Sequence, residues 1–349
     1  MKITVLAGGL SPERDVSLSS GSLIANALID KGHQVALIDV YEGLSIPGEG
    51  VASLFYTAAD GHQFSYKVPE KEPDLDDIRR KNGNRRELVG PGVLDLCRAS
   101  DVVFLALHGA MGENGQIQAF FDVLGIPYTG SGYAGCLLAM DKDVTKRLLV
   151  RDGIPTADWV LVQPDREDRH TMLERIRMEI GFPCVVKPLS CGSSVGVSMV
   201  TAYEELEKAL DAASLWESRI LVEKKITGRE FSIGIFLDRA LPSIEIIPVQ
   251  GFYDYANKYQ GGRSREICPA DLPPQEESAL ATLALSVHRC LQLGSYSRID
   301  FIRDDKGVFW CLEANTLPGM TPTSLLPQEA RATGISYGDL CEAIAAHPV

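Results

Sequence analysis

The opening of the chain limits the fold most, because it reads as a strand, a helix and a second strand in direct succession. Residues 3–7 and 34–40 are apolar runs of strand length. Between them, apolar side chains recur with the spacing of one helix face, at Leu23, Ile24, Ala27 and Leu28. This order predicts a βαβ unit, which requires a parallel sheet and therefore an α/β fold.

The turn after the first predicted strand bears on the kind of ligand. It reads GGLSPERDVS, and the GxGxxG pattern of a dinucleotide-binding turn is absent. A dinucleotide-dependent oxidoreductase is suggested only by the βαβ unit. That alternative therefore loses its main support.

Length, charge and cysteine usage narrow the class of protein. The 349 residues allow two or three domains, and the net charge of −13 argues against a nucleic-acid partner or an anionic membrane surface. The eight cysteines form no CxxC pair, and the amino-terminal apolar run is too short for a membrane span or a signal peptide. We expect free thiols and a cytoplasmic protein.

A Gly-rich loop follows the buried strand predicted at residues 102–107, in the segment DVVFLALHGAMGENG. Open α/β sheets bind ligands at the carboxyl ends of their strands. His108 and Glu113 are therefore placed where chemistry is expected. A purely structural role for His108 fits this pattern equally well.

The middle of the chain carries a candidate phosphate site. Residues 136–157 have the pattern of one amphipathic helix ended by Gly153, and Lys142 lies within it. Then FPCVVKPLSCGSSVGVSMV reads as a strand with Lys187, a Gly/Ser loop and a strand at residues 195–200. Backbone N–H groups of such a loop can bind a triphosphate and a lysine can neutralise it. No Walker P-loop is present, and a plain turn remains an alternative.

Two further segments carry carboxylates. Glu223 and Glu230 lie at a predicted strand junction, where they could bind an adenosine or simply face solvent. In SRIDF and LEANT, residues two apart share one strand face, so Asp300, Glu313 and Asn315 can meet across one hairpin. Hard oxygen ligands of this kind suit Mg²⁺.

Seven segments together resemble the D-alanine-D-alanine ligases of the ATP-grasp family, over the whole chain except residues 41–100. They are GGLSPERDVSLSSG, LHGAMGENGQIQ, YTGSG followed by AMDKDVTK, FPCVVKPLSCGSSVGV, FYDYANKY, SRIDF and LEANTLPGMTPTSLLP. The resemblance implies three α/β domains. These are an amino-terminal Rossmann-like substrate domain at residues 1–130, a central ATP-grasp domain at 131–224 and a carboxy-terminal ATP-grasp and catalytic domain at 225–349.

The same resemblance implies an ADP-forming ligation that supplies bacterial peptidoglycan synthesis. ATP phosphorylates the carboxylate of one D-alanine, and the amine of a second D-alanine attacks the acyl phosphate. Two Mg²⁺ or Mn²⁺ ions, with lysine and arginine side chains, offset the accumulated negative charge. A homodimer is also implied.

Roles for individual residues follow from the resemblance alone. The metal ligands correspond to Asp300, Glu313 and Asn315, and the nucleotide contacts to Lys142, Lys187, Glu223 and Glu230. Glu13 corresponds to the residue that holds the ammonium of the first substrate, and His108 to one near that substrate. The remaining catalytic and binding positions correspond to Ser193, Lys258, Tyr259, Arg298, Gly319 and Ser324.

These last positions divide into three tasks. Arg298 and the backbone N–H of Gly319 stabilise developing oxyanion charge, while Lys258 and Ser324 hold the carboxylate of the second substrate. Ser193 and Tyr259, with Glu13, tie a mobile lid over the site. The lid would exclude water from the acyl phosphate.

Some features depart from the family pattern or leave alternatives open. Cys191 stands where many members carry Glu, and residues 41–100 form a longer stretch that we expect to contain loops and irregular strands. Relatives that prefer D-lactate replace the Lys-Tyr pair of the lid, so Lys258-Tyr259 favours D-alanine. A ligase that uses D-lactate or D-serine and a non-catalytic ATP-grasp binding module remain as alternatives.

Overall fold

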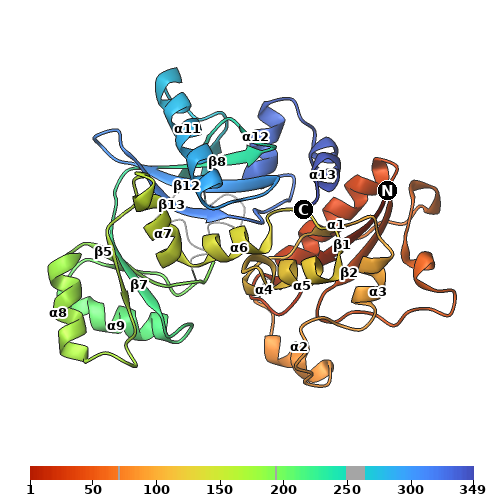
Figure 1. Ribbon diagram of the computed structural model, residues 1–349, viewed down its shortest axis with the longest axis horizontal. Coiled ribbons are helices and arrows are strands. Elements are labelled where there is room, and N and C mark those ends of the chain that lie inside the picture. Colours follow the sequence, from red (N-terminus) through yellow and green to blue (C-terminus); the bar gives the residue numbers. More distant parts are fainter. Residues whose placement is uncertain (70, 193–194, 249–263) are drawn as a thin grey trace.

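The fold is built on three β-sheets (Figure 1). The computed structural model describes residues 1–69, 71–192, 195–248 and 264–349. The first sheet has the order β2-β1-β3 and is parallel throughout. It consists of β1 (Lys2–Ala7), β2 (Gln34–Asp39) and β3 (Val102–Leu105), and α1 (Arg14–Asp30) connects β1 to β2. The predicted βαβ unit is confirmed.

The stretch between β2 and β3 is more helical than the sequence pattern predicts. It contains η1 (Val51–Leu54), η2 (Ala58–Asp60), α2 (Leu75–Lys81) and α3 (Val93–Arg98). In its described part, the only pairing with a strand is an isolated bridge between Val35 and Tyr56. The prediction of irregular strands was wrong, since local signals favour helix. Asp74 caps α2 by accepting a hydrogen bond from the Asp77 N–H at 2.9 Å.

The second sheet is antiparallel and has the order β4-β7-β5-β6. Its strands are β4 (Trp159–Val162), β5 (Cys184–Pro188), β6 (Ser198–Val200) and β7 (Ile220–Lys224). Helices α8 (Arg169–Glu179) and α9 (Tyr203–Ser214) pack on one face, where Val186 and Val222 belong to the apolar core. Because side chains alternate along a strand, their neighbours Lys187 and Glu223 point to the opposite face.

The third sheet is antiparallel, with the order β11-β10-β8-β12-β13 and β9 paired to β8. Its strands are β8 (Arg229–Phe236), β9 (Arg239–Ala240), β10 (Ile244–Pro248), β11 (Ser264–Ile267), β12 (Tyr296–Arg303) and β13 (Phe309–Asn315). Helices α6 (Tyr133–Met140), α7 (Lys142–Arg151) and α11 (Pro274–Cys290) pack against it in one apolar core. The antiparallel hairpin predicted around residues 298–315 is confirmed.

The single helix predicted to run from residue 136 to Gly153 is wrong, because α6 and α7 are separate, although α7 does end just before Gly153. Asp141 interrupts the helix with a ψ of 99°, and its side chain accepts a hydrogen bond from the Val144 N–H at 3.0 Å. This cap starts α7 at Lys142. The break therefore fixes the position of a predicted nucleotide-binding lysine.

The carboxy-terminal end of the chain returns to the first sheet. After β3, α4 (Ala110–Glu113) and α5 (Gln116–Leu124) follow, and the chain ends with α12 (Leu325–Ala332) and α13 (Tyr337–Ala345). Helices α1 and α13 lie side by side (Figure 1). Leu340 and Ile344 of α13 are buried in the same apolar core as Ile24 and Leu28 of α1. The core of the first sheet is thus completed by α13.

The predicted three-domain division remains a prediction. The three sheets occupy successive stretches of the chain, but the helices at residues 133–151 pack with the third sheet and α13 packs with the first. All eight cysteines are free thiols, as predicted. No helix in the described part of the chain is long and apolar enough to span a membrane.

Glu329 of α12 is fully buried against the third sheet. One of its oxygens, Oε2, accepts a hydrogen bond from the Gly234 N–H at 2.6 Å, and Oε1 has no partner among the described residues. A side chain at position 234 would collide with this carboxyl group, since a Cβ there would be 2.3 Å from Oε2. Burial raises the pKa of Glu329 well above its ordinary value of 4.5. The folded protein therefore keeps this carboxyl group protonated to higher pH than the unfolded chain does.

We expect Glu329→Gln to stabilise the protein at pH 8 but not at pH 5. The stability that the raised pKa provides is complete below pH 4.5 and is lost as the pH rises toward the folded-state pKa. Glutamine keeps an oxygen acceptor for Gly234 and cannot ionise. Denaturant unfolding at the two pH values measures the difference. Equal stability of variant and parent at pH 8 would show that ionisation of the buried Glu329 does not destabilise the protein at high pH.

Candidate active site

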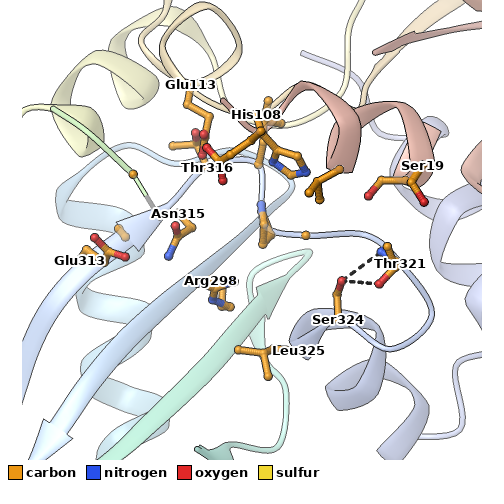
Figure 2. A pocket seen from close by; sticks show the side chains of 18 of the residues that line it. Ser19, His108, Glu113, Arg298, Glu313, Asn315, Thr316, Thr321, Ser324 and Leu325 are labelled. Atoms are coloured by element: carbon orange, nitrogen blue, oxygen red, sulfur yellow. Dashed lines mark hydrogen bonds between the residues drawn. The ribbon is translucent and has the colours of Figure 1, made fainter. Parts of the chain in front are cut away.

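Two adjoining cavities contain most of the predicted site residues. The first has a volume of about 550 Å³ and lies between the start of α1, the loop after β3 and the segment after β13 (Figure 2). The second has a volume of about 940 Å³ and lies between the second and third sheets. Lys142 and Glu313 line both cavities. Groups bound in the two cavities would therefore meet at these side chains.

The carboxylates of the predicted metal site lie on neighbouring strands. Asp300 of β12 is in register with Glu313 of β13, and the register of the two strands shifts directly after Asp300. Ser232 Oγ donates to Asp300 Oδ1 at 2.7 Å, and Asn315 Nδ2 donates to Oδ2 at 3.0 Å. Two facing carboxylates and a carboxamide form an oxygen-rich set that fits a hard cation. The described residues contain no cluster of three or more His, Cys, Asp or Glu side chains suited to a metal.

Arg298 holds Asp300 with both arms of its guanidinium group. Its Nε donates to Oδ1 at 3.0 Å and its Nη2 to Oδ2 at 2.8 Å. Arg298 is in register with Asn315 and lines the first cavity. The arginine thus fixes one predicted metal ligand and also faces the space where a substrate would lie.

Two buried lysines line the second cavity from different elements, and Lys142 also lines the first. Lys142, the first residue of α7, donates to the carbonyl oxygen of Cys191 at 2.9 Å, and its Nζ is 3.9 Å from Glu313 Oε2. Lys187 of β5 forms an ion pair of 2.5 Å with Glu223 Oε1. Burial lowers the pKa of Lys142, while the nearby Glu313 opposes this shift. Both ammonium groups are placed to bind an anion.

Glu223, predicted to contact adenosine, lies between two lysines. Lys187 binds one carboxylate oxygen, and Lys146 Nζ lies 2.8 Å from the other. Burial would raise the pKa of Glu223, but the two lysines lower it to about 2. Glu223 therefore stays ionised in the second cavity, where Glu230 also forms part of the wall.

The first cavity has a second group of ionisable residues around the start of α1, of which Glu13 and His108 are buried and Glu113 is half-buried. Glu13 directly precedes α1 and is buried, and Glu113 Oε2 accepts a hydrogen bond from the Gly109 N–H at 2.7 Å. Burial, together with Glu13, raises the pKa of Glu113 to about 8. Burial also lowers the pKa of His108, although Glu13 opposes this shift. Burial thus favours the neutral form of both Glu113 and His108.

The loop between β13 and α12 forms the opposite wall. Ser324 begins α12 as its N-cap residue, and its Oγ lies 2.7 Å from Thr321 Oγ1 and accepts a hydrogen bond from the Thr321 N–H at 3.1 Å (Figure 2). A Cβ at Gly319 would be only 3.0 Å from Ser324 Oγ. A glycine therefore allows the backbone to approach the serine closely.

The structure brings most of the predicted residues together. The first cavity is lined by Glu13, His108, Arg298, Asn315, Gly319 and Ser324, and the second by Lys187, Glu223, Glu230 and Asp300. Three predicted positions, Ser193, Lys258 and Tyr259, lie outside the described residues. The roles of all these residues remain predictions.

Two residues of the site had no role in the sequence-based prediction. Glu113 was predicted to lie in a loop after the third strand, without a function, and is instead the last residue of α4. Lys146 was not singled out. A signal for Lys146 exists, since it lies four residues after Lys142 and therefore on the same helix face.

Comparisons with known proteins agree over nearly the whole chain. The family models described as D-ala D-ala ligase N-terminus and D-ala D-ala ligase C-terminus match residues 2–131 and 148–346. The D-alanine-D-alanine ligase of Lacticaseibacillus casei is 42% identical over 342 residues, which are 97% of this chain and 93% of that protein. The enzyme of the same name from Pediococcus pentosaceus is 41% identical over 348 residues, 99% of this chain and 96% of its own.

Solved structures give the same result. The D-alanine-D-alanine ligase from Bacillus anthracis complexed with ATP has a TM-score of 0.74 and 28% identity, and the match covers 99% of this chain and 96% of that one. A second structure of the Bacillus anthracis enzyme has a TM-score of 0.75 and 31% identity, with coverage of 99% and 97%. The ATP-grasp type of α/β fold that the sequence predicts is thus confirmed by its structural neighbours. The chain belongs to the D-alanine-D-alanine ligase family.

Proposed function

We propose that this protein joins two molecules of D-alanine in an ATP-dependent, ADP-forming reaction and supplies the dipeptide for bacterial peptidoglycan synthesis. The observation that carries this proposal is the meeting of the two cavities at Lys142 and Glu313. A carboxylate is a poor electrophile, so the first D-alanine must receive a phosphoryl group before an amine can attack it. Adjoining nucleotide and amino-acid cavities suit this transfer.

The residues of the first cavity suit the binding and activation of two small zwitterions. Glu13 would bind the ammonium group of the first D-alanine, with His108 close by. Arg298 and the Gly319 N–H would stabilise negative charge on the oxygens at the reacting carbon. Ser324, with Lys258, would hold the carboxylate of the second D-alanine. The raised pKa of Glu113 favours its neutral form, which would limit the negative charge in a cavity that must admit two carboxylates.

The residues of the second cavity suit ATP. Lys142 and Lys187 would bind its phosphates, and Glu223 and Glu230 lie where the nucleoside would bind. Asp300, Glu313 and Asn315 would hold two Mg²⁺ or Mn²⁺ ions, which neutralise phosphate charge when bound. Ser193 and Tyr259, with Glu13, would fasten a lid that keeps water from the D-alanyl phosphate.

The cellular setting is also part of the proposal. We place the protein in the cytoplasm, because ATP is its co-substrate and its cysteines are free. We further propose a homodimer, supported by apolar side chains exposed on the packed helices α5 and α6. These are Phe120, Val123, Tyr133 and Leu137.

A phosphate-release assay with ATP and Mg²⁺ tests the proposed reaction. D-alanine, L-alanine, D-serine and D-lactate are supplied separately, the last two also in competition with D-alanine, and products are identified by mass. We expect only D-alanine to give phosphate and dipeptide in equal amounts. A mixed product with D-lactate or D-serine would overturn the choice of second substrate, and ATP binding without any product would indicate a binding module.

A further inference from the structure

Lys146 of α7 is a buried lysine that lies beside the two cavities without forming part of their walls. Only 2% of its surface is accessible, and it lines neither of the two cavities described above. Its ammonium group makes three polar contacts, to Glu223 Oε2 at 2.8 Å, Thr156 Oγ1 at 2.9 Å and the Ala157 carbonyl oxygen at 3.0 Å. A bound nucleotide would therefore not touch Lys146, whose ammonium group is already held by two hydrogen bonds and one ion pair.

The contact between Lys146 and Glu223 fixes the orientation of the Glu223 carboxylate and balances its charge. Glu223 has Lys146 on one oxygen and Lys187 on the other, so the carboxylate is held from both sides. The three groups carry one negative and two positive charges. Lys187 lines the second cavity, so the surplus positive charge is available to an anion there.

Loss of Lys146 would change both the orientation of Glu223 and the net charge of the cluster. Glu223 would keep its charge in a buried place with only Lys187 as a partner. The pair would then be neutral overall, and the carboxylate would be free to turn toward Lys187 with both oxygens. An anionic ligand would have to compete with this tighter pair for the lysine.

We propose that Lys146 is a positioning residue for ATP, which holds Glu223 so that Lys187 presents a net positive charge to the phosphates. This inference rests on the proposed ATP-dependent function. It differs from a purely structural role of Lys146, which its contacts to Thr156 and Ala157 would also permit. The two roles make different predictions for nucleotide binding.

The first test compares single variants by calorimetric ATP titration and thermal unfolding. We expect Lys146→Met to raise the Kd for ATP about ten-fold or more, with a smaller change in the KM for D-alanine. Arg147→Gln removes the same charge from the same helix, but Arg147 is exposed and pairs with Asp143, so its Kd should match the parent. Thr156→Val removes the structural hydrogen bond of Lys146 and should lower stability without weakening ATP binding.

The second test is a double-mutant cycle with Glu223→Gln. If Lys146 acts through the charge of Glu223, its replacement should matter less once Glu223 is neutral, so the two effects on Kd are not additive. Additive effects, or a Lys146→Met variant that is less stable but binds ATP like the parent, would overturn the proposal.

Should the parent protein itself fail to bind ATP, the proposed function fails instead. If Lys146→Met does not fold, the Thr156→Val and Glu223→Gln variants decide. A loss of ATP affinity in Thr156→Val as large as that in Glu223→Gln would indicate a structural role and overturn the proposal, whereas parental affinity in Thr156→Val with a loss in Glu223→Gln would support it.

Discussion

Replacing Arg298 with lysine is expected to lower kcat for dipeptide formation about 100- to 1000-fold. The guanidinium group binds both oxygens of Asp300, at 3.0 and 2.8 Å, and also lines the cavity proposed for D-alanine. A lysine has one compact ammonium group and cannot hold both oxygens in the same geometry. Asp300 would lose the two hydrogen bonds that orient it. The negative charge that develops on the oxygens of the reacting carbon would lose a hydrogen-bond donor. Steady-state phosphate release measures the change.

Arg303→Lys is the matched control. Arg303 lies at the far end of the same strand and pairs with Glu276 at 2.7 Å, outside both cavities. The same chemical change there should leave kcat close to that of the parent. An Arg298→Lys variant with parental kcat would remove Arg298 from the proposed catalytic set, whatever happens to stability.

Replacing Glu313 with glutamine is expected to lower kcat about 100-fold and to raise the Mg²⁺ concentration for half-maximal activity about ten-fold or more. Glu313 faces Asp300 across the hairpin and lines both cavities. Glutamine keeps the shape but removes the negative charge, so a divalent cation would be held less tightly. A Mg²⁺ titration at saturating ATP and D-alanine measures both effects.

Asp305→Asn serves as the control for Glu313. Asp305 is exposed in the turn of the same hairpin, so the charge change is equal but remote from the cavities. Its Mg²⁺ dependence should equal that of the parent. If Glu313→Gln lowers kcat without changing the Mg²⁺ requirement, the assignment of Glu313 as a metal ligand is wrong.

The sequence predicts the parts of the site that depend on local spacing. Residues two apart share a strand face, so the meeting of Asp300 with Glu313 could be predicted from the hairpin alone. The opening βαβ unit follows from periodicity in the same way. Local rules of this kind require no knowledge of distant residues.

Features that depend on distant partners could not be predicted. Lysine is rarely buried, so burial of Lys146 becomes plausible only when Glu223, far along the chain, is known to lie beside it. Glu329 is similar, since its acceptor role depends on Gly234 of another element. The break at Asp141 is local, but the apolar periodicity continues across it and hides the cap.

The sharing of one apolar core by α1 and α13 has a consequence for how the protein is made. Ribosomes deliver the amino terminus first, so β1, α1, β2 and β3 emerge long before Leu340 and Ile344. The apolar surface that these two residues cover stays exposed throughout synthesis. A nascent chain that stalls before α13 would present this surface to chaperones and proteases, and quality control could thereby recognise an unfinished molecule.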